Sequence, residues 1–391
     1  MNNQQSLKIL TLDGGGLQAL ATLSSICAVC QAIAKENKAA RIPAPHELFD
    51  IICGVGTGGW IALLLGRYRL DVATCMAVYM EIARKVDSDR NTSRWPRRNR
   101  AFKLDQDQLV SVVEDTLLRY NLDATLLREE SPAPNVFERG QTRCAQAFAV
   151  GIKQGRNKQG TEYELFRSYN LEGKSASTLS GPEPRKCRTS QAFAAVGAAK
   201  FFLKPYKVGK SVFFDETFPQ SHPISSMALD EALTVYGPDV EISVLLNIGP
   251  GIPSEQDCKT LDSMSIGPIA RLTRKFSWPG RKEASLKGKK PVDNDSQNEV
   301  QQHDSTPSTP SESALRLECQ RRLDIRDRLK GLYGDSGAEK YHHLGPDYSL
   351  EKASLNDVHA IRLFRTRSRE SQGRAAEIGG AVSQYWVNTR A

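Results

Sequence analysis

Three short segments of the chain carry residue types that could do chemistry. The first is the glycine run Gly14, Gly15, Gly16 after Asp13, the second is the turn "GVGTGG" at 54–59, and the third is Asp215 in "SVFFDETF". A glycine run that opens a helix exposes backbone N–H groups, which can hold a phosphate or the oxyanion of acyl transfer. We therefore expect the three glycines to form an anion-binding loop, with a plain tight turn as the alternative.

The glycine run does not match the loops that bind nucleotide phosphates. The segment "DGGGLQA" places Ala19 where a dinucleotide fingerprint needs its last glycine, and the chain contains no G-x-x-x-x-G-K-[ST]. These departures exclude the common nucleotide loops and leave an oxyanion as the expected ligand.

The turn at 54–59 has the strand, tight turn and helix of a nucleophile elbow, G-x-S-x-G. Gly54 and Gly58 occupy the two glycine positions, and Gly56 stands where the serine belongs. Thr57 is adjacent, but a turn that presents position 56 is expected to direct position 57 elsewhere. Cys53 belongs to the preceding strand and is expected in the core. The sequence thus predicts an elbow without a nucleophile.

Alternating strands and helices are expected to position these segments. Apolar patterning predicts a strand over 7–12, a helix over 17–37, a strand over 49–53 and a helix from residue 60. Further helices are expected over 71–86 and 105–120, and further strands over 144–152, 163–170, 211–215 and 240–249. This order predicts an α/β fold with a largely parallel sheet. The three segments would then meet because each follows a strand that ends at the same edge of a parallel sheet.

Four stretches, in order and spacing, resemble the patatin-like phospholipases, and fungal members in particular. They are "LTLDGGGLQAL", "FDIICGVGTGGWIALLLG", "TSQAFAAVGAAKFF" and "VFFDETFPQSHPISSMALDEAL". The resemblance implies a three-layer α/β sandwich with a mainly parallel central sheet and C-terminal helices. It also implies a Ser–Asp dyad for acyl-ester cleavage. Carried over by position, 14–16 would be the oxyanion loop, Gly56 would occupy the nucleophile site, and Asp215 would be the base.

The chain departs from this family pattern at each motif core. Glycine replaces serine at Gly56, Gln18 replaces the usual arginine, and Asp215-Glu216-Thr217 replaces D-G-G/A. We therefore expect a protein of phospholipase ancestry that lacks normal ester hydrolase activity and keeps acyl-lipid binding or a partner role. One alternative is an active acyl-ester or thioester hydrolase, or an acyltransferase, in which Asp215 activates a water. Another is a non-enzymatic signalling or scaffold module.

The remaining candidate residues have simpler interpretations. Asp215 could be a helix cap or an arginine partner, and His222 precedes a proline at a helix start, as a turn residue does. The pair His342-His343 lacks a third ligand at a recognisable spacing, and Cys27 and Cys30 lack a second pair, so no metal is expected. No cofactor is expected either.

Composition divides the chain into three parts: a patatin-like domain at 1–253, a flexible basic and low-complexity insert at 254–313, and C-terminal helices at 314–391 that pack on the same domain. Within the insert, residues 281–313 are too polar to offset their ordering entropy, and we expect disorder there.

Charge and hydropathy restrict the partners. The net charge is +8, and residues 271–290 hold eight basic residues and one acidic residue, so the rest of the chain is nearly neutral. This pattern argues against a nucleic-acid face and for one basic segment that could contact anionic lipid or a protein, or simply be a solvated linker. No apolar stretch reaches the roughly 18 residues that cross a bilayer, and the N-terminus is polar. We expect a cytoplasmic protein with its eight cysteines reduced, and a peripheral membrane location is the alternative.

Overall fold

The computed structural model describes ten stretches of the chain and one further residue: 6–15, 19–92, 106–127, 145–154, 161–171, 187–198, 205–214, 224–249, 312–344, 378–379 and 383. The predictions made for Gly16, Asp215, His222 and the basic segment 271–290 therefore lie outside the described residues.

An eight-stranded mixed sheet runs through the molecule in the order β5-β6-β3-β2-β1-β7-β8, with β4 also paired to β3. The five strands from β8 to β3 are parallel to their neighbours, and β4, β5 and β6 add antiparallel pairs at the other end. The strands are β1 Ser6–Leu12, β2 Ile51–Val55, β3 Gln146–Gln154, β4 Thr161–Arg167, β5 Tyr206–Val208, β6 Ser211–Phe213, β7 Glu241–Ile248 and β8 Tyr341–Leu344.

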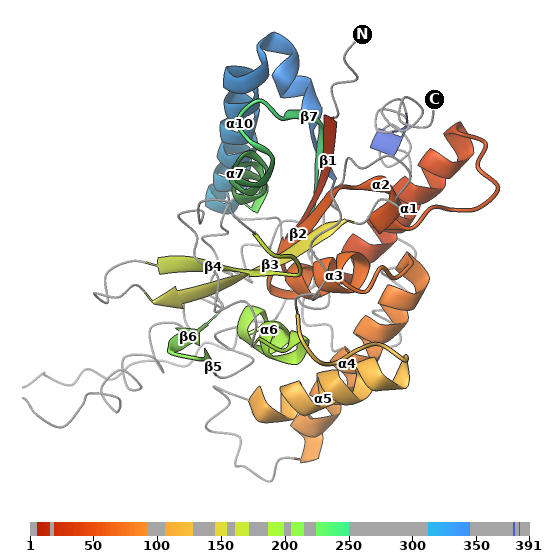
Figure 1. Cartoon of the computed structure of the whole chain (residues 1–391), viewed down its shortest axis with the longest axis vertical. Helices are drawn as coiled ribbons and strands as arrows, with labels where there is room; N and C mark the ends of the chain where they lie inside the picture. Colours follow the sequence, from red (N-terminus) through yellow and green to blue (C-terminus); the bar gives the residue numbers. More distant parts are fainter. Residues whose placement is uncertain are drawn as a thin grey trace, which may run out of the picture.

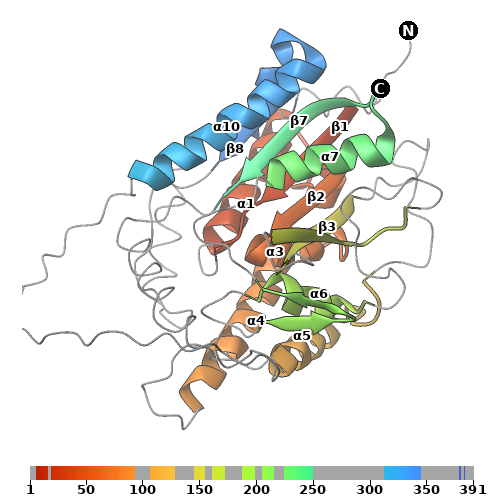
Figure 2. The ribbon, with the colours of Figure 1, turned by 90° about the vertical axis from the view of Figure 1, so that its left-hand side faces the viewer.

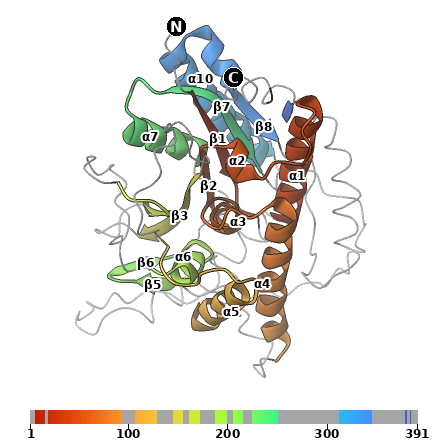
Figure 3. The ribbon, with the colours of Figure 1, turned by 45° about the vertical axis from the view of Figure 1, so that its right-hand side comes forward.

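Helices cover both faces of this sheet, as Figure 3 shows for α7 and α1 on opposite sides of β1. One face carries α7 and α10, and the other carries α1, α3 and α6, with α4 and α5 beyond them (Figures 1 and 2). The helices are α1 Ala19–Glu36, α2 Pro45–Leu48, α3 Gly56–Gly66, α4 Val72–Thr92, α5 Gln106–Arg119, α6 Thr189–Val196, α7 Ile224–Tyr236 and α10 Glu312–Tyr333, with a 3-10 helix, η2, at Asp335–Lys340.

The alternation of side chains along β1 explains these layers. Leu7 and Ile9 point into the cluster under α7 and α10, whereas Leu10 and Leu12 point into the cluster under α1 and α3, and all four are fully buried. Successive side chains of a strand face opposite sides, so a strand that is apolar at nearly every position must be covered twice. The predicted three-layer α/β sandwich is confirmed.

Most predicted elements are present, with some differences. The strands β5 and β8 were not expected from the sequence; each is only three or four residues long. The predicted disorder extended to residue 313, but α10 begins at Glu312. The buried Ile378 belongs to the cluster under α1, and a methyl group at Gly379 would lie 2.3 Å from Ala32 Cβ. The described part of the C-terminus therefore packs on the domain.

Helix α1 is long and apolar enough to cross a membrane by length and composition, so the expectation that no stretch reaches this length was wrong. In the fold, 61% of this helix is buried, and it contacts α3, α4 and β7. The core helix of a layered domain meets the same criteria as a spanning helix because both are apolar around most of their circumference.

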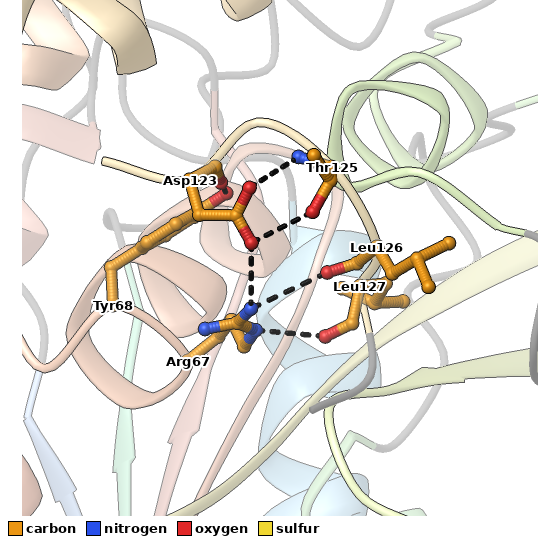
Figure 4. A network of polar contacts seen from close by, with 6 residues as sticks. All are labelled: Arg67, Tyr68, Asp123, Thr125, Leu126 and Leu127. Atoms are coloured by element: carbon orange, nitrogen blue, oxygen red, sulfur yellow. Dashed lines mark hydrogen bonds and ion pairs between the residues drawn. The ribbon is translucent and has the colours of Figure 1, made fainter. Parts of the chain in front are cut away.

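A polar cluster holds the C-terminal end of α3 against the chain after α5 (Figure 4). The Arg67 guanidinium donates to the carbonyl of Leu127 at 2.9 Å, and the Tyr68 hydroxyl donates to the carbonyl of Asp123 at 2.5 Å. Thr125 donates to the Asp123 carboxylate from its backbone and its side chain, which lowers the pKa of Asp123. This cluster fixes the far end of the helix whose first residue is Gly56.

A second polar cluster is fully buried between β4 and α7. The Arg167 guanidinium donates to the two Glu231 carboxylate oxygens at 2.6 and 2.8 Å, and the Tyr169 hydroxyl donates to the same carboxylate at 2.6 Å. A buried ion pair needs such bidentate geometry and an additional donor to offset its desolvation. The cluster therefore connects α7 to the sheet at one defined position.

Candidate active site at the carboxyl edge of the sheet

The chain turns sharply from β2 into α3 at Gly56. Val55 is extended, with φ −118° and ψ 152°, and the helix begins at the next residue. Gly56 has a φ of +52°, in the left-handed region that side chains disfavour. The elbow predicted from the sequence is present, and its apex residue has the backbone conformation in which glycine costs least.

Steric crowding explains the glycines on either side of the apex. A methyl group at Gly54 would lie 2.4 Å from the backbone of Gly58, and one at Gly58 would lie 2.5 Å from the carbonyl oxygens of Leu12 and Asp13. These glycines let α3 start directly against the end of β1. The elbow and the glycine loop are therefore in backbone contact.

The glycine loop begins where β1 ends. The Asp13 N–H still donates to Ile248 of β7 at 3.1 Å, and the Gly15 N–H donates to the hydroxyl oxygen of Thr57 at 3.1 Å. The Thr57 hydroxyl also hydrogen-bonds with the Tyr79 phenol, whose pKa is raised by burial. Gly14 and Gly15 thus lie beside the elbow, and their role as an oxyanion loop stays a prediction.

The expected direction of Thr57 was wrong. The turn was predicted to direct this side chain away from the site, but its hydroxyl faces the glycine loop. The reason is that α3 begins at Gly56, so Thr57 is already in the first helical turn and faces the loop that packs on it. Held by an amide and a phenol, this hydroxyl is placed to support the loop.

Asp215 directly follows the last described residue of its segment. Phe214 donates its N–H to Ile152 at 2.9 Å, and Phe213 pairs with Lys153 near the carboxyl end of β3. The pairing is antiparallel, so the expectation that Asp215 follows a parallel strand was wrong. The strand that precedes Asp215, β6, runs opposite to β3 but still lies at the edge of the sheet where β3 ends.

Burial disfavours the thiolate form of three cysteines, one of which, Cys53, directly precedes the elbow. Cys53 is fully buried on the α7 side of β2. Burial raises its pKa well above the usual range, and the negative charges of Glu231 and Asp13 raise it further. Burial likewise raises the pKa of Cys27 and of Cys30. Among the described residues, no group of three His, Cys, Asp or Glu side chains could hold a metal ion.

No pattern in the sequence indicates the row of polar side chains just below this edge. Thr11, Asn247 and His343 lie side by side on neighbouring strands β1, β7 and β8, and their side chains are hydrogen-bonded in series. They are separated by 236 and 96 residues in sequence, and no local pattern predicts such contacts. His343 was considered only as a metal ligand.

Comparison with known protein families identifies the fold around this edge. The family model described as patatin-like phospholipase matches residues 10–215, which is more than half of the chain. The chain belongs to the patatin-like phospholipase family. The match spans the glycine loop, the elbow and Asp215, and the fungal subtype stays a prediction.

Curated relatives of this patatin-like protein include plant and animal phospholipases. Phospholipase A I from Arabidopsis thaliana is 26% identical over 282 residues, which cover 63% of this chain and 21% of that protein. Calcium-independent phospholipase A2-gamma is 25% identical in Mus musculus and 24% identical in Homo sapiens, over 63% of this chain and 29% and 28% of those proteins. The chain thus matches less than a third of the length of these relatives.

Proposed function

We propose that this patatin-like protein binds acyl lipid at the carboxyl edge of its sheet without ordinary ester hydrolysis. The observation that carries the proposal is Gly56, a residue without a side chain at the apex of a well-formed elbow. Phospholipase ancestry and the names of the relatives support a lipid ligand. A basic segment at 271–290 would add contact with an anionic lipid surface, and a cytoplasmic location is proposed with it.

The backbone conformation supports the loss of chemistry. A non-glycine residue in the left-handed region costs on the order of 1–3 kcal/mol, which enzymes tolerate where the strain presents a reactive group. Gly56, with a φ of +52°, adopts this conformation without that cost, and it also lacks the side chain that a nucleophile needs. The Gly15 amide donates to Thr57, so this donor is already satisfied within the protein. Both features favour binding over turnover.

A partner-binding scaffold is the second candidate, and Trp60 favours it. This side chain lies one turn beyond Gly56 on α3, is 5% exposed, stacks on Phe193 at 5.5 Å and donates to its carbonyl at 2.8 Å. A methyl group at Gly197 would lie 2.4 Å from the indole ring. The space between α3 and α6 is therefore filled by protein, which leaves less room for an acyl chain on that side.

The deciding experiment restores the missing hydroxyl. Wild type and Gly56→Ala should hydrolyse p-nitrophenyl acyl esters and phospholipid at background, whereas Gly56→Ser should show turnover, and the double variant with Asp215→Asn should lose it. Wild-type turnover that Asp215→Asn abolishes would overturn the proposal in favour of an Asp215-activated water. Native mass spectrometry with added fatty acid and lysophospholipid tests binding, and the absence of any bound lipid would favour the scaffold.

A further inference from the structure

Five polar side chains connect both helices of one face to the sheet just below the glycine loop. The Asn247 amide donates to the Thr11 hydroxyl at 3.1 Å, and Thr11 lies 3.0 Å from the Ser225 hydroxyl of α7. In the other direction, the Asn247 amide oxygen lies 2.6 Å from His343 Nδ1, and His343 Nε2 lies 2.7 Å from the Arg322 guanidinium of α10. We call this set the polar row.

The polar row lies where three parallel strands end. Thr11 is two residues before Asp13, the first residue of the glycine loop. Two backbone hydrogen bonds border the row on this edge: Asp13 N–H to Ile248 at 3.1 Å, and Gly249 N–H to Leu344 at 3.0 Å. A shift of β8 would therefore disturb the row and the adjoining end of β1 together.

The register of β8 needs such a constraint. This strand has four residues, lies at the sheet edge, pairs with β7, and contains two histidines in succession. A slip of one residue moves every side chain of a strand to the opposite face. Here a slip would put His342 in the place of His343, so the backbone and the residue type alone favour the observed register only weakly over the shifted one. The hydrogen-bond partners of His343 favour the observed register.

The hydrogen-bond roles assign a neutral ring to His343. A guanidinium can only donate, so Nε2 must accept from Arg322 and carries no proton. The Asn247 amide nitrogen donates to Thr11, so its oxygen accepts, and Nδ1 of the ring carries the proton. A protonated ring would place a second N–H against a guanidinium nitrogen at 2.7 Å, which combines a lost hydrogen bond with like-charge repulsion.

Other charges around this ring act in both directions. A methyl group at Gly249 would lie 3.0 Å from the Asp13 carboxylate and 3.6 Å from His343 Cε1. The carboxylate and the ring therefore lie on the same side of Gly249, and this negative charge favours the cationic form of the ring. Arg322 opposes that form from hydrogen-bonding distance. On the opposite face of β8, burial lowers the pKa of His342, and the charge of Arg326 adds to this shift.

We propose that neutral His343 is a positioning residue that holds the segment 312–344 in register on β7 and, through Asn247 and Thr11, fixes the end of β1 beneath the glycine loop. Protonation of the ring disconnects Arg322 and loosens this edge. Acidification that protonates the ring thereby loosens the glycine loop from a position outside it. The segment that supplies the control lies beyond the residues matched by the family model.

Amide hydrogen exchange of the full chain tests the proposal, with the N–H groups of Gly249 and Asp13 as reporters. Exchange is compared at about pH 7.5 and about pH 5.5 after correction for the intrinsic rate. Each tenfold fall in the neutral fraction of His343 should speed the exchange of both amides about tenfold, so both should exchange faster at the lower pH. Equal corrected rates at the two values in the wild type would overturn the proposal.

Two variants and a matched control distinguish this role from plain packing. Arg322→Gln can donate to neutral Nε2 or accept from the charged ring, so it should remove most of the pH response while exchange at about pH 7.5 stays slow. In His343→Phe, the Gly249 and Asp13 amides should exchange fast at both pH values. His342→Gln changes the neighbouring histidine on the opposite face and should keep the wild-type response. Loss of the response in His342→Gln, with retention in Arg322→Gln, would assign the effect to His342.

Discussion

The hydroxyl oxygen of Thr57 lies 3.1 Å from the amide nitrogen of Gly15, which joins the first turn of α3 to the glycine loop. The two residues are 42 positions apart in sequence. In this arrangement the residue next to the empty nucleophile position supports the loop, because its hydroxyl is also held by Tyr79.

Thr57→Val should therefore loosen the loop. Valine keeps the shape of threonine but leaves the Gly15 N–H without its acceptor, and an unmet donor of this kind costs about 1–3 kcal/mol. We expect faster exchange of the Gly15 amide and a lower free energy of unfolding in urea, whereas Thr57→Ser should remain close to wild type. If a fluorophosphonate ester probe instead labels Thr57 in the wild type, this residue is a nucleophile and the supporting role is wrong.

The buried ion pair between β4 and α7 predicts a large loss of stability. Glu231→Ala removes the buried carboxylate that accepts from Arg167 and Tyr169, and breaking a buried ion pair costs about 3–5 kcal/mol. The exposed pair of Lys330 and Asp335 serves as a control, and Asp335→Ala should change the unfolding free energy by less than about 1 kcal/mol. Similar effects of the two variants would show that burial does not control the energetics of this pair.

The burial of Cys53 predicts that its thiol, beside the elbow, reacts slowly with alkylating agents. Its pKa is raised by desolvation, so the thiol stays protonated, and the thiolate that reacts with alkylating agents is scarce. At about pH 8, iodoacetamide should leave Cys53 unmodified in the folded protein and modify it after denaturation, as measured by peptide mass spectrometry. Because the pKa of Cys53 is raised, the thiolate forms only at a higher pH or after unfolding, and labelling should increase under both conditions. Rapid labelling of Cys53 in the folded protein would contradict this.

The sequence predicted the layers well because the relevant signals are local. Strands with apolar residues on both faces, such as 7–12 and 241–248, need helices on both sides, and the spacing of apolar residues located those helices. The short strands β5 and β8 carry too few residues for any period to be visible. The strand direction at Phe213 was wrong because a pairing partner is a tertiary fact that alternation does not encode.

For the candidate site, the residue types were decided by the sequence and the contacts by the fold. The chain alone established a glycine loop, an elbow and a glycine at its apex, since these depend on identity and spacing over a few residues. Only the tertiary structure placed the Thr57 hydroxyl on the Gly15 amide and brought His343 to Asn247 and Thr11. Such contacts form where strand ends converge, and side chains distant in sequence become neighbours there because the sheet sets their register.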